Sequence, residues 1–541
     1  MTPVTVRQPI QPVVPTEPQP RRGWGHRLEW AAPYLLAVYF FGSALYGINK
    51  TEVIDTDAAR HAMNGAFIYD WIRTGHLLHP IEYGRFYYNR MPALSIPFHP
   101  PLFPAIEALF FAIFGVHLFT ARLAIAVCVA VSSVLLYRLA RATVGPPILA
   151  ACITLSTFSL WICKNLSRDV MLECPALVFT LAAVYCLRGV RESYPLRRAL
   201  PFALFAAAAL WTKQHTVFLG AVPFLEAAFA RRWRRFLEWP LWISSAVYGM
   251  AVLAIIWFSR LFHGTGVNMI STSSRDVYYI FHSTLPHYFS WMAADLAGMP
   301  GVLAVCALGV YLWSMRRRDR VKPHLGLYIV WVLAVIALLL DLGPISPRYL
   351  FFAMPALMTI AFAWLFYGCR TIWGERTAGI VSAVLAAGFL IAGFGVPFDF
   401  LRGPAEAARV VVEGKATRVL YAGEADGNFI FAIREFDPNR QIIVIPAVKL
   451  PEGLLKAADA SRLSKWYGVD WVVMENTSAR HPWSGFRDTV PRIAELQQSI
   501  PLQSSRYRWR SGSLDIYRIS TKSQTPAAVE FSVPGIEGTR R

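Results

Sequence analysis

The chain has 541 residues, of which 55% are hydrophobic and only 16% are charged. A soluble protein has about 25% charged residues, so this composition excludes an ordinary soluble enzyme. The net charge of +19 does not indicate a nucleic-acid partner, because the basic clusters RRWRR (231–235) and RRRDR (316–320) stand between apolar runs, as they do in loops beside a membrane.

The first 28 residues are polar and rich in proline, which predicts a disordered cytoplasmic tail. Residues 29–398 alternate between apolar runs and short polar connections, and we interpret them as one transmembrane domain. A span needs about 20 apolar residues. Runs near this length cover 30–48, 119–137, 147–163, 170–187, 199–212, 215–230, 240–259, 299–315, 325–342, 349–369 and 377–396. The predicted fold class is a polytopic α-helical membrane protein with about eleven to thirteen spans.

The positive-inside rule sets the sides of these spans. Three arginines within residues 21–27 put the N-terminus in the cytoplasm, and every later dense basic cluster then falls in a cytoplasmic loop. Counting the apolar run at 102–115 as a span would invert all later loops. Because this run is short and carries Glu107, we predict a juxtamembrane or re-entrant helix on the outer face. Residues 49–118 then form one large external loop.

Beyond residue 398 the pattern changes. Short apolar segments read as strands, and they alternate with helical stretches such as GLLKAADASRLSKWYG (453–468); the predicted strands are TRVLYAG (417–423), QIIVIPAV (441–448) and VDWVVMEN (469–476). This alternation predicts a small C-terminal α/β domain over 399–522, outside the cytoplasm, followed by a disordered tail over 523–541. We expect it to act as a lid, an acceptor platform or a stabilising module.

The external loop contains the side chains that are the best candidates for catalysis and substrate binding. Asp55 and Asp57 directly follow the first span, at the boundary between membrane and water. A carboxylate at this place can accept the proton of an acceptor hydroxyl. Arg60, one helical turn after Asp57, can hold a leaving phosphate. Either aspartate fits the role of the base, and ordinary solvated or helix-capping roles explain the same residues about equally well.

Further polar residues stand at the predicted outer ends of spans, and each has two explanations. Asp169 fits an active-site carboxylate or a cap of the next helix. Lys213 fits a phosphate ligand or a side chain that snorkels to the interface. Arg348 and Tyr349 fit the rest of a phosphate clamp or an interfacial anchor. The histidine spacing supports no metal site, so we expect no obligatory metal or other cofactor and leave a divalent-cation requirement open.

The external loop resembles that of two families with the GT-C fold, the bacterial lipid A aminoarabinose transferases and the protein O-mannosyltransferases. The matching segments, which span residues 50–360, are DAARHA (57–62), DWIRTGHLLHP (70–80), HPPLFP (99–104), Arg122, Asp169, WTKQ (211–214) and RYLFFAMPAL (348–357). Two positions depart from the first family: Ala58 replaces the second acid of its Asp-Glu pair, and His99 stands where it has lysine. The histidine favours the mannosyltransferase-like branch.

This resemblance implies an inverting glycosyltransferase of the bacterial inner membrane, which moves a hexosyl or pentosyl group. The donor is a polyprenyl-phosphate-linked sugar, and the acceptor is a lipid, glycan or protein outside the cytoplasm. Asp57 is the implied catalytic carboxylate, and Arg60 is the implied ligand of the lipid phosphate. We expect His99, Lys213, Arg348 and Tyr349 to complete the site for the donor phosphate. Membrane lipids are the other expected partners. The alternative is a transporter or flippase of a lipid-linked sugar, which predicts inverted repeats that the sequence does not show.

Overall fold

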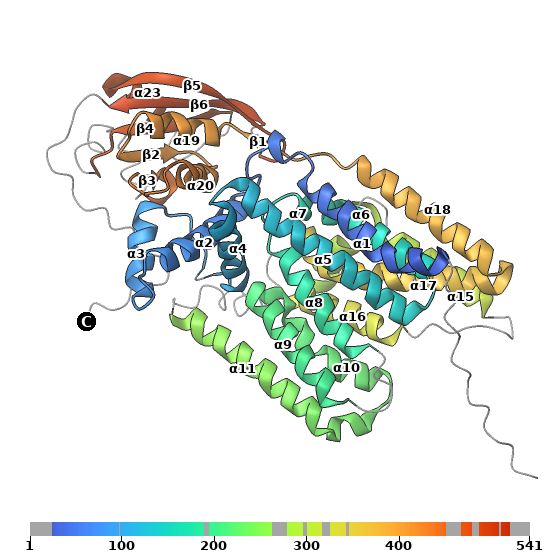
Figure 1. Cartoon of the computed structure of the whole chain (residues 1–541). Coiled ribbons are helices and arrows are strands. Elements are labelled where there is room, and N and C mark those ends of the chain that lie inside the picture. Colours follow the sequence, from blue (N-terminus) through green and yellow to red (C-terminus); the bar gives the residue numbers. More distant parts are fainter. Residues whose placement is uncertain are drawn as a thin grey trace, which may run out of the picture.

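The structure, a computed structural model, describes residues 24–96, 98–188, 194–261, 279–295, 300–315, 325–341, 346–450, 467–478, 486–507 and 510–519. Long apolar helices form a bundle, and a smaller part built on a β-sheet sits at one end of it (Figure 1). The predicted tails and the helical stretch 453–468 lie almost entirely outside the described residues. Helix α1 begins at Trp24, inside the range predicted as the first tail.

Each apolar run predicted from the sequence coincides with a helical segment. The helices of the bundle are α1 (Trp24–Leu45), α5 (Leu118–Val144), α6 (Pro147–Ser159), α7 (Trp161–Ser167), α8 (Glu173–Leu187), α9 (Leu196–Thr212), η2 (Gln214–Gly220), α10 (Val222–Phe229), η3 (Trp233–Leu237), α11 (Trp239–Leu261), η4 (Ile280–Thr284), α14 (Leu285–Ser290), η5 (Trp291–Asp295), α15 (Pro300–Ser314), α16 (Gly326–Asp341), η6 (Pro347–Ala353), α17 (Met354–Trp373) and α18 (Glu375–Phe394). By length and composition, five helices of the described part can cross a membrane, or six if α6 and α7, which meet at 67°, count as one span. The number of eleven to thirteen spans therefore stays a prediction.

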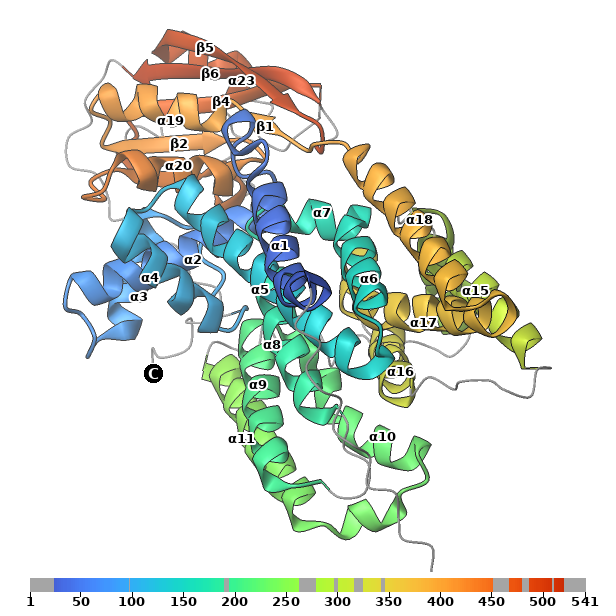
Figure 2. The same cartoon turned by 45° about the vertical axis from the view of Figure 1, so that its right-hand side comes forward.

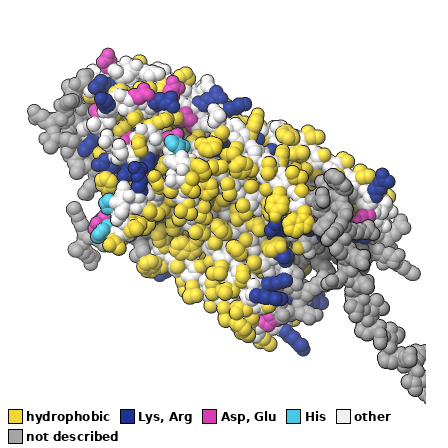
Figure 3. Space-filling model, in the orientation of Figure 1, with side chains coloured by type: hydrophobic (Ala, Val, Ile, Leu, Met, Phe, Trp, Pro, Cys, Tyr) yellow, Lys and Arg dark blue, Asp and Glu magenta, His cyan; other side chains and the backbone are white. Residues whose placement is uncertain are grey.

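The outer surface of the bundle is apolar. Val38 of α1, Leu253 of α11 and Ile391 of α18 all point outward and are exposed. Figure 3 shows hydrophobic side chains covering the middle of one face, with Lys and Arg gathered toward its two ends. A continuous apolar surface of this extent is stable against lipid and unfavourable against water, so the bundle has the surface of a membrane protein.

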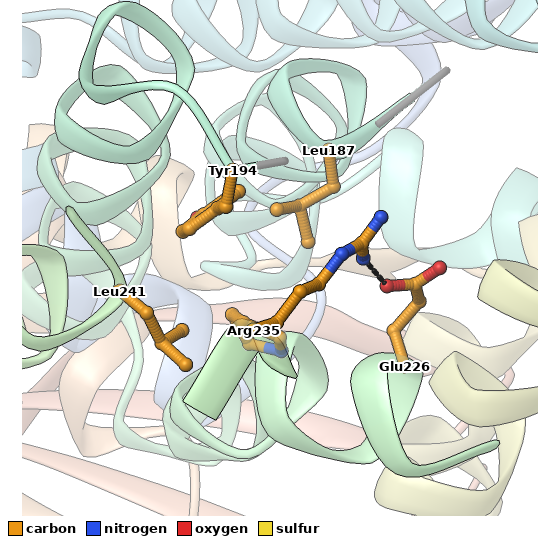
Figure 4. Close-up of a pocket in the computed structure, with 6 residues that line it drawn as sticks. Leu187, Tyr194, Glu226, Arg235 and Leu241 are labelled. Atoms are coloured by element: carbon orange, nitrogen blue, oxygen red, sulfur yellow. Dashed lines mark hydrogen bonds and ion pairs between the residues drawn. The ribbon is translucent and has the colours of Figure 1, made fainter. Parts of the chain in front are cut away.

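The basic cluster RRWRR connects α10 to α11, at the end of the bundle away from the sheet (Figure 2). Its last member, Arg235, is buried and forms an ion pair with Glu226 of α10. Figure 4 shows this pair in a small pocket that Leu187, Tyr194 and Leu241 also line. A buried arginine requires a partner. Arg235 therefore joins the ends of neighbouring helices instead of lying free in the loop.

The first loop contains three helices, α2 (Thr56–Arg73), α3 (Pro80–Arg90) and α4 (Leu102–Phe114). Helix α4 is the run whose assignment decides the topology, and at 13 residues it is too short for an upright span. It lies beside α2, on the same side of the bundle as the sheet (Figure 1). Glu107 of α4 is fully buried against Gly65 of α2, where any larger side chain would clash with the carboxyl group.

The C-terminal part contains a six-stranded sheet with the order β1–β5–β6–β4–β2–β3. Strands β2, β3 and β4 are parallel to one another, and the remaining pairs are antiparallel. The elements are β1 (Leu401–Arg402), α19 (Pro404–Glu413), β2 (Arg418–Ala422), α20 (Asp426–Phe436), β3 (Ile443–Pro446), η7 (Ala447–Lys449), β4 (Trp471–Thr477), α23 (Phe486–Ile493), β5 (Ala494–Ser504) and β6 (Ser511–Ile519). The three strands predicted from the sequence are β2, β3 and β4.

Alternate residues of the parallel strands pack on opposite faces of the sheet, as the two-residue repeat of a strand requires. Val419 and Val473 belong to the same apolar core as α19 and α20. Leu420 and Val472 face the other side, in a second core that includes Val490 of α23. The sheet is therefore covered on both faces, and α20 lies between it and α2 of the first loop (Figure 1).

A buried charge cluster attaches this sheet to the first loop. The Asp70 carboxylate of α2 accepts hydrogen bonds from Nε and Nη2 of Arg434 in α20, at 2.8 and 2.7 Å. Arg440 Nη1 lies 2.6 Å from Asp70 Oδ1, and the Tyr87 hydroxyl donates to Oδ2 at 3.0 Å. The Asp70 side chain is fully buried and that of Arg434 is 2% exposed. These four hydrogen-bond and ionic contacts compensate the burial of both charges.

Replacing Asp70 with asparagine is expected to destabilise the protein by about 3–5 kcal/mol, because Arg434 would stay buried without a charged partner. The loss should appear as a lower midpoint of thermal unfolding of the purified protein in detergent. Glu82→Gln is the matched control, since it breaks an exposed pair with His79 on α3, and exposed pairs contribute about 0–1 kcal/mol. Equal midpoints for the two variants would contradict the role of the buried pair.

Candidate active site

Helix α2 begins at an N-cap that Asp55 provides. The Asp55 side chain accepts the backbone N–H of Asp57 at 2.9 Å, which satisfies one of the unpaired donors of the first turn. Its Oδ2 also lies 3.1 Å from Nη2 of Arg506, in the connection between β5 and β6. Asp55 therefore acts as the cap of the helix, and the side chain of Asp57 in the first turn takes no part in capping.

The Asp57 carboxylate lies between two arginines. Its Oδ2 accepts a hydrogen bond from Nη1 of Arg348 at 3.2 Å, and its Oδ1 is 3.9 Å from Nη1 of Arg60. Partial burial opposes ionisation, but the guanidinium of Arg348, assisted by Arg60, outweighs it and lowers the pKa of Asp57. The side chain is 38% exposed. It is therefore an ionised carboxylate that a substrate can reach.

A third cation, Lys213, lies at the end of α9. Its Nζ is 2.6 Å from Oε1 of Glu173, the first residue of α8, and both side chains are buried. Desolvation lowers the pKa of Lys213, and the Glu173 carboxylate opposes this shift. The second carboxylate oxygen of Glu173 has no hydrogen-bond partner in the described part of the chain. The pair therefore places the Lys213 ammonium group near Arg348 and Asp57, with Glu173 as its buried counter-charge.

Glu173 was not among the site residues predicted from the sequence, although the sequence contains a signal for it. Helices α8 and α9 are consecutive and closely packed. Consecutive spans joined by a short connection run antiparallel, which places the start of α8 beside the end of α9. An acid that opens one span and a lysine that closes the next therefore lie at the same end of the hairpin, where they can pair.

Aromatic and histidine rings surround these charges. His99, before α4, packs edge-on against His61 of α2 with ring centroids 4.7 Å apart. Burial, assisted by the neighbouring cations, lowers the pKa of His99 to about 3, so its ring is neutral. Tyr349 stacks on His215 at 4.4 Å, and its ring lies 5.3 Å from the guanidinium carbon of Arg348. Tyr349 is buried, so it supports Arg348 from within the bundle.

Asp169 is buried behind the start of α2. Its carboxylate accepts the backbone N–H groups of Ile54, Asp55 and Val170 at 3.4, 3.1 and 2.9 Å. Burial, together with the negative charge of Asp55, raises the pKa of Asp169 to about 6. It does not cap the next helix, because α8 begins after Leu172 with no side-chain cap. Asp169 instead holds the backbone that leads to Asp57.

Two side chains of the C-terminal part face the same region. Lys449 of η7 donates a hydrogen bond to the Tyr88 hydroxyl at 2.7 Å, and burial lowers the pKa of Lys449 to about 8. Asp426 opens α20, and burial raises its pKa against the opposing charges of Arg60 and Lys449. No chemistry was predicted for this part from the sequence, so both residues are additions to the predicted site.

The structure therefore brings together most of the predicted site residues: Asp57, Arg60, His99, Lys213, Arg348 and Tyr349. One accessible carboxylate and three cations can accept a proton and bind a phosphate. Asp55 and Asp169 accept backbone N–H groups at the start of α2 and so fix the backbone that leads to Asp57. Across the described ranges, no group of three or more His, Cys, Asp and Glu side chains is placed to hold a metal ion.

A family described as dolichyl-phosphate-mannose-protein mannosyltransferase matches residues 98–260, which include His99 and Lys213. No curated protein matches the chain. Among solved structures, ArnT from Cupriavidus metallidurans bound to undecaprenyl phosphate is similar over 92% of this chain and 99% of its own, at 12% identity and a TM-score of 0.54. The apo state of the same protein is similar over 91% and 98%, at 15% identity and a TM-score of 0.55.

A third similar structure is the archaeal oligosaccharyltransferase AglB from Archaeoglobus fulgidus, in complex with an inhibitory peptide and a dolichol-phosphate. It covers 90% of this chain and 75% of its own, at 11% identity and a TM-score of 0.50. Likeness at such low identity shows the fold. The chain is therefore a membrane protein with the GT-C fold of glycosyltransferases, as the resemblance of its first loop predicted.

Proposed function

We propose that this protein is an inverting glycosyltransferase that moves a sugar from a polyprenyl-phosphate donor to an acceptor outside the cytoplasm of a bacterial inner membrane. The observation that carries the proposal is the ionised, accessible Asp57 carboxylate between Arg348 and Arg60. The GT-C fold supports it, because similar structures were solved with undecaprenyl phosphate and with a dolichol-phosphate.

In the proposed reaction, Asp57 takes the proton of an acceptor hydroxyl while the hydroxyl oxygen attacks C1 of the sugar. The bond between C1 and the phosphate oxygen breaks, and the polyprenyl phosphate leaves with the bonding electrons. Attack opposite to the leaving group inverts the configuration at C1. Arg348 and Arg60 stabilise the charge that grows on the leaving phosphate, for which a guanidinium has a matching geometry.

Because Asp57 is paired with Arg348, binding of the donor phosphate also changes the pKa of Asp57. A phosphate that binds Arg348 shares the guanidinium with Asp57 and brings negative charge close to it. Both changes raise the pKa of Asp57 toward its ordinary value or above it. The carboxylate therefore becomes a stronger base when the donor is present, and the free enzyme keeps it ionised but less basic.

Other residues complete the donor site. Lys213 supplies a third positive charge to the phosphate, and Glu173 keeps that lysine charged in an apolar environment. His99 is neutral and donates a single hydrogen bond, while Tyr349 supports the guanidinium of Arg348. Asp169 is a positioning residue that fixes the backbone before Asp57.

The C-terminal sheet then lies on the outer side of the membrane, with the N-terminus in the cytoplasm. It packs on the first loop through α20, and it brings Asp426 and Lys449 toward Arg60. We propose that this part forms the acceptor side of the site, because Tyr507 hydrogen-bonds Thr56, next to Asp57, and Gly427 of α20 packs on the first turn of α2.

Asp57→Asn is expected to reduce sugar transfer by about 100-fold or more, because general base catalysis contributes about 10²–10⁴-fold. Transfer would be measured in proteoliposomes, from radiolabelled polyprenyl-phosphate sugars to cell-envelope acceptors. Asp55→Asn is the matched control. It removes the same charge two residues away but keeps a residue that caps helices equally well, so its transfer should stay within a few-fold of the wild type.

Loss of transfer in Asp55→Asn with retention in Asp57→Asn would move the role of the base to Asp55. Movement of the donor lipid between leaflets, without transfer to any acceptor, would instead support a flippase.

The pH dependence of sugar transfer can show whether Asp57 or Asp169 is the general base. Because the pKa of Asp57 is lowered, it stays ionised above its ordinary value of about 3.9. The ratio kcat/KM for transfer, which reports the free enzyme, should therefore stay constant from about pH 8 down to about pH 5 and fall only at lower pH. An acid limb near the pKa of Asp169, which is about 6, would assign the base to Asp169 and contradict the role of Asp57.

Glu173→Gln is expected to destabilise the protein by about 3–5 kcal/mol, because the Lys213 ammonium would remain buried without its partner. The double variant Glu173→Leu/Lys213→Met removes both charges and should recover most of the thermal midpoint. If Lys213 binds the donor phosphate, this stable double variant should still show a KM for the donor raised by about tenfold, equivalent to a loss of about 1.4 kcal/mol. An unchanged KM would contradict the phosphate role.

A further inference from the structure

Three cations that the proposed reaction does not use are buried close together in the bundle. They are Lys164 of α7, Arg168 directly after α7, and Arg122 of α5, with exposed fractions of 3%, 7% and 2%. Lysine and arginine are almost never buried to this degree unless they are paired. An ionisable side chain in a membrane-spanning segment such as α6–α7 generally marks a functional site.

The partners of these cations inside the protein are few. Lys164 Nζ donates to the Ser43 hydroxyl of α1 at 3.0 Å, and Arg122 donates to the backbone carbonyl of Arg168. Nε and Nη1 of both arginines have no hydrogen-bond partner among the residues that the structure describes. Two carboxylates lie near the arginines: that of Asp169, beside Arg122, accepts three backbone N–H groups, and that of Asp399, beside Arg168, accepts the Ser505 hydroxyl. Four buried guanidinium nitrogens are therefore free to bind an anion.

Aromatic rings cover Lys164 and Arg168. Their centroids lie 5.4–6.0 Å from the two charged groups, and they belong to Tyr39 of α1, Tyr46 directly after α1, Phe394 of α18 and Phe398 beyond α18. Cation–π contacts of this length recover only part of the cost of burying a charge. A bound anion would offset the rest of this cost of burying the two charges.

The position of these cations shows what kind of anion would reach them. Helix α6 lies between α1 and α18, and α7 follows at the end of α6 that is nearer to the sheet (Figure 2). The apolar sides of α1 and α18 face outward, and of the covering rings, those of Tyr46 and Phe394 are themselves exposed. The cations therefore lie just beneath a surface that faces lipid, at the level where the bundle meets the sheet.

We propose that Arg168, Lys164 and Arg122 form a binding site for the phosphate of an anionic membrane lipid, with its acyl chains along α6 between α1 and α18. Guanidinium groups bind phosphate through paired N–H donors, and the lysine adds a point charge. The apolar surroundings select a lipid phosphate over a free one, since only a lipid also covers the outward faces of α1 and α18. Arg168 adjoins Asp169, so this lipid would lie behind the loop that carries Asp57.

Native mass spectrometry of the full chain in detergent micelles tests this site, with phosphatidylglycerol and phosphatidylcholine of identical acyl chains as probes. The wild type should bind one phosphatidylglycerol about tenfold more tightly than phosphatidylcholine. Lys164→Gln/Arg168→Gln should lose this preference, whereas Arg168→Lys, which keeps the charge, should retain it. The matched control Arg138→Gln/Arg370→Gln removes two arginines at the other end of the bundle and should retain it as well.

Equal binding of the two lipids by the wild type, or an unchanged preference in Lys164→Gln/Arg168→Gln, would overturn the proposal. Displacement of phosphatidylglycerol by inorganic phosphate at equal concentration would overturn the assignment to a lipid. Lys164→Met removes one charge while keeping an apolar side chain of similar length. It keeps the test decisive if the double variant does not fold, with an expected loss of preference of about fivefold; an unchanged preference in this variant would equally count against the site.

Discussion

The buried ion pair between Asp70 and Arg434 is the contact on which the arrangement of the outer part depends. Both side chains are almost completely excluded from solvent. Arg434 is tolerated there because Asp70 is present, and Asp70 because Arg434 and Arg440 are. Asp70 lies near the end of α2, and Asp57 lies at its beginning, paired with Arg348 of η6. The 18 residues of α2 therefore form a rigid link between the sheet and the membrane bundle. The position of the Asp57 carboxylate is therefore fixed by contacts at both ends of α2.

Burial also decides which charged groups near α2 can take part in chemistry. Glu173 is committed to Lys213, and Asp169 is committed to the backbone before the helix. His99 is kept neutral by its surroundings, because burial lowers its pKa to about 3. Asp57 differs from these groups, because it is partly open to solvent and still ionised. The same physical effect therefore disfavours the neighbouring groups in the role of the base and favours Asp57.

The sequence predicted the helices and the central strands well, because both follow from local patterns. A helix that crosses a bilayer needs a long run of apolar residues. A parallel strand that is buried on both faces appears as a short run of apolar residues. The residues around Asp57 were predicted through a family resemblance, and the structure does bring them together. The pair of Asp70 and Arg434 could not be predicted, because 364 positions separate its members and neither belongs to a recognisable pattern. The buried cations Lys164 and Arg168 were missed for a similar reason, since their burial depends on how α1 and α18 pack beside α7.

The central claim is that the phosphate of a polyprenyl-phosphate donor binds beside Asp57. A cryo-electron microscopy structure of the full chain in lipid nanodiscs with a polyprenyl phosphate tests it most directly. We expect phosphate density in hydrogen-bond contact with Arg348 and Lys213, and a longer distance between Arg348 and Asp57 than the 3.2 Å of the free protein. Phosphate density that contacts neither of these cations, with the pair of Asp57 and Arg348 unchanged, would contradict the account.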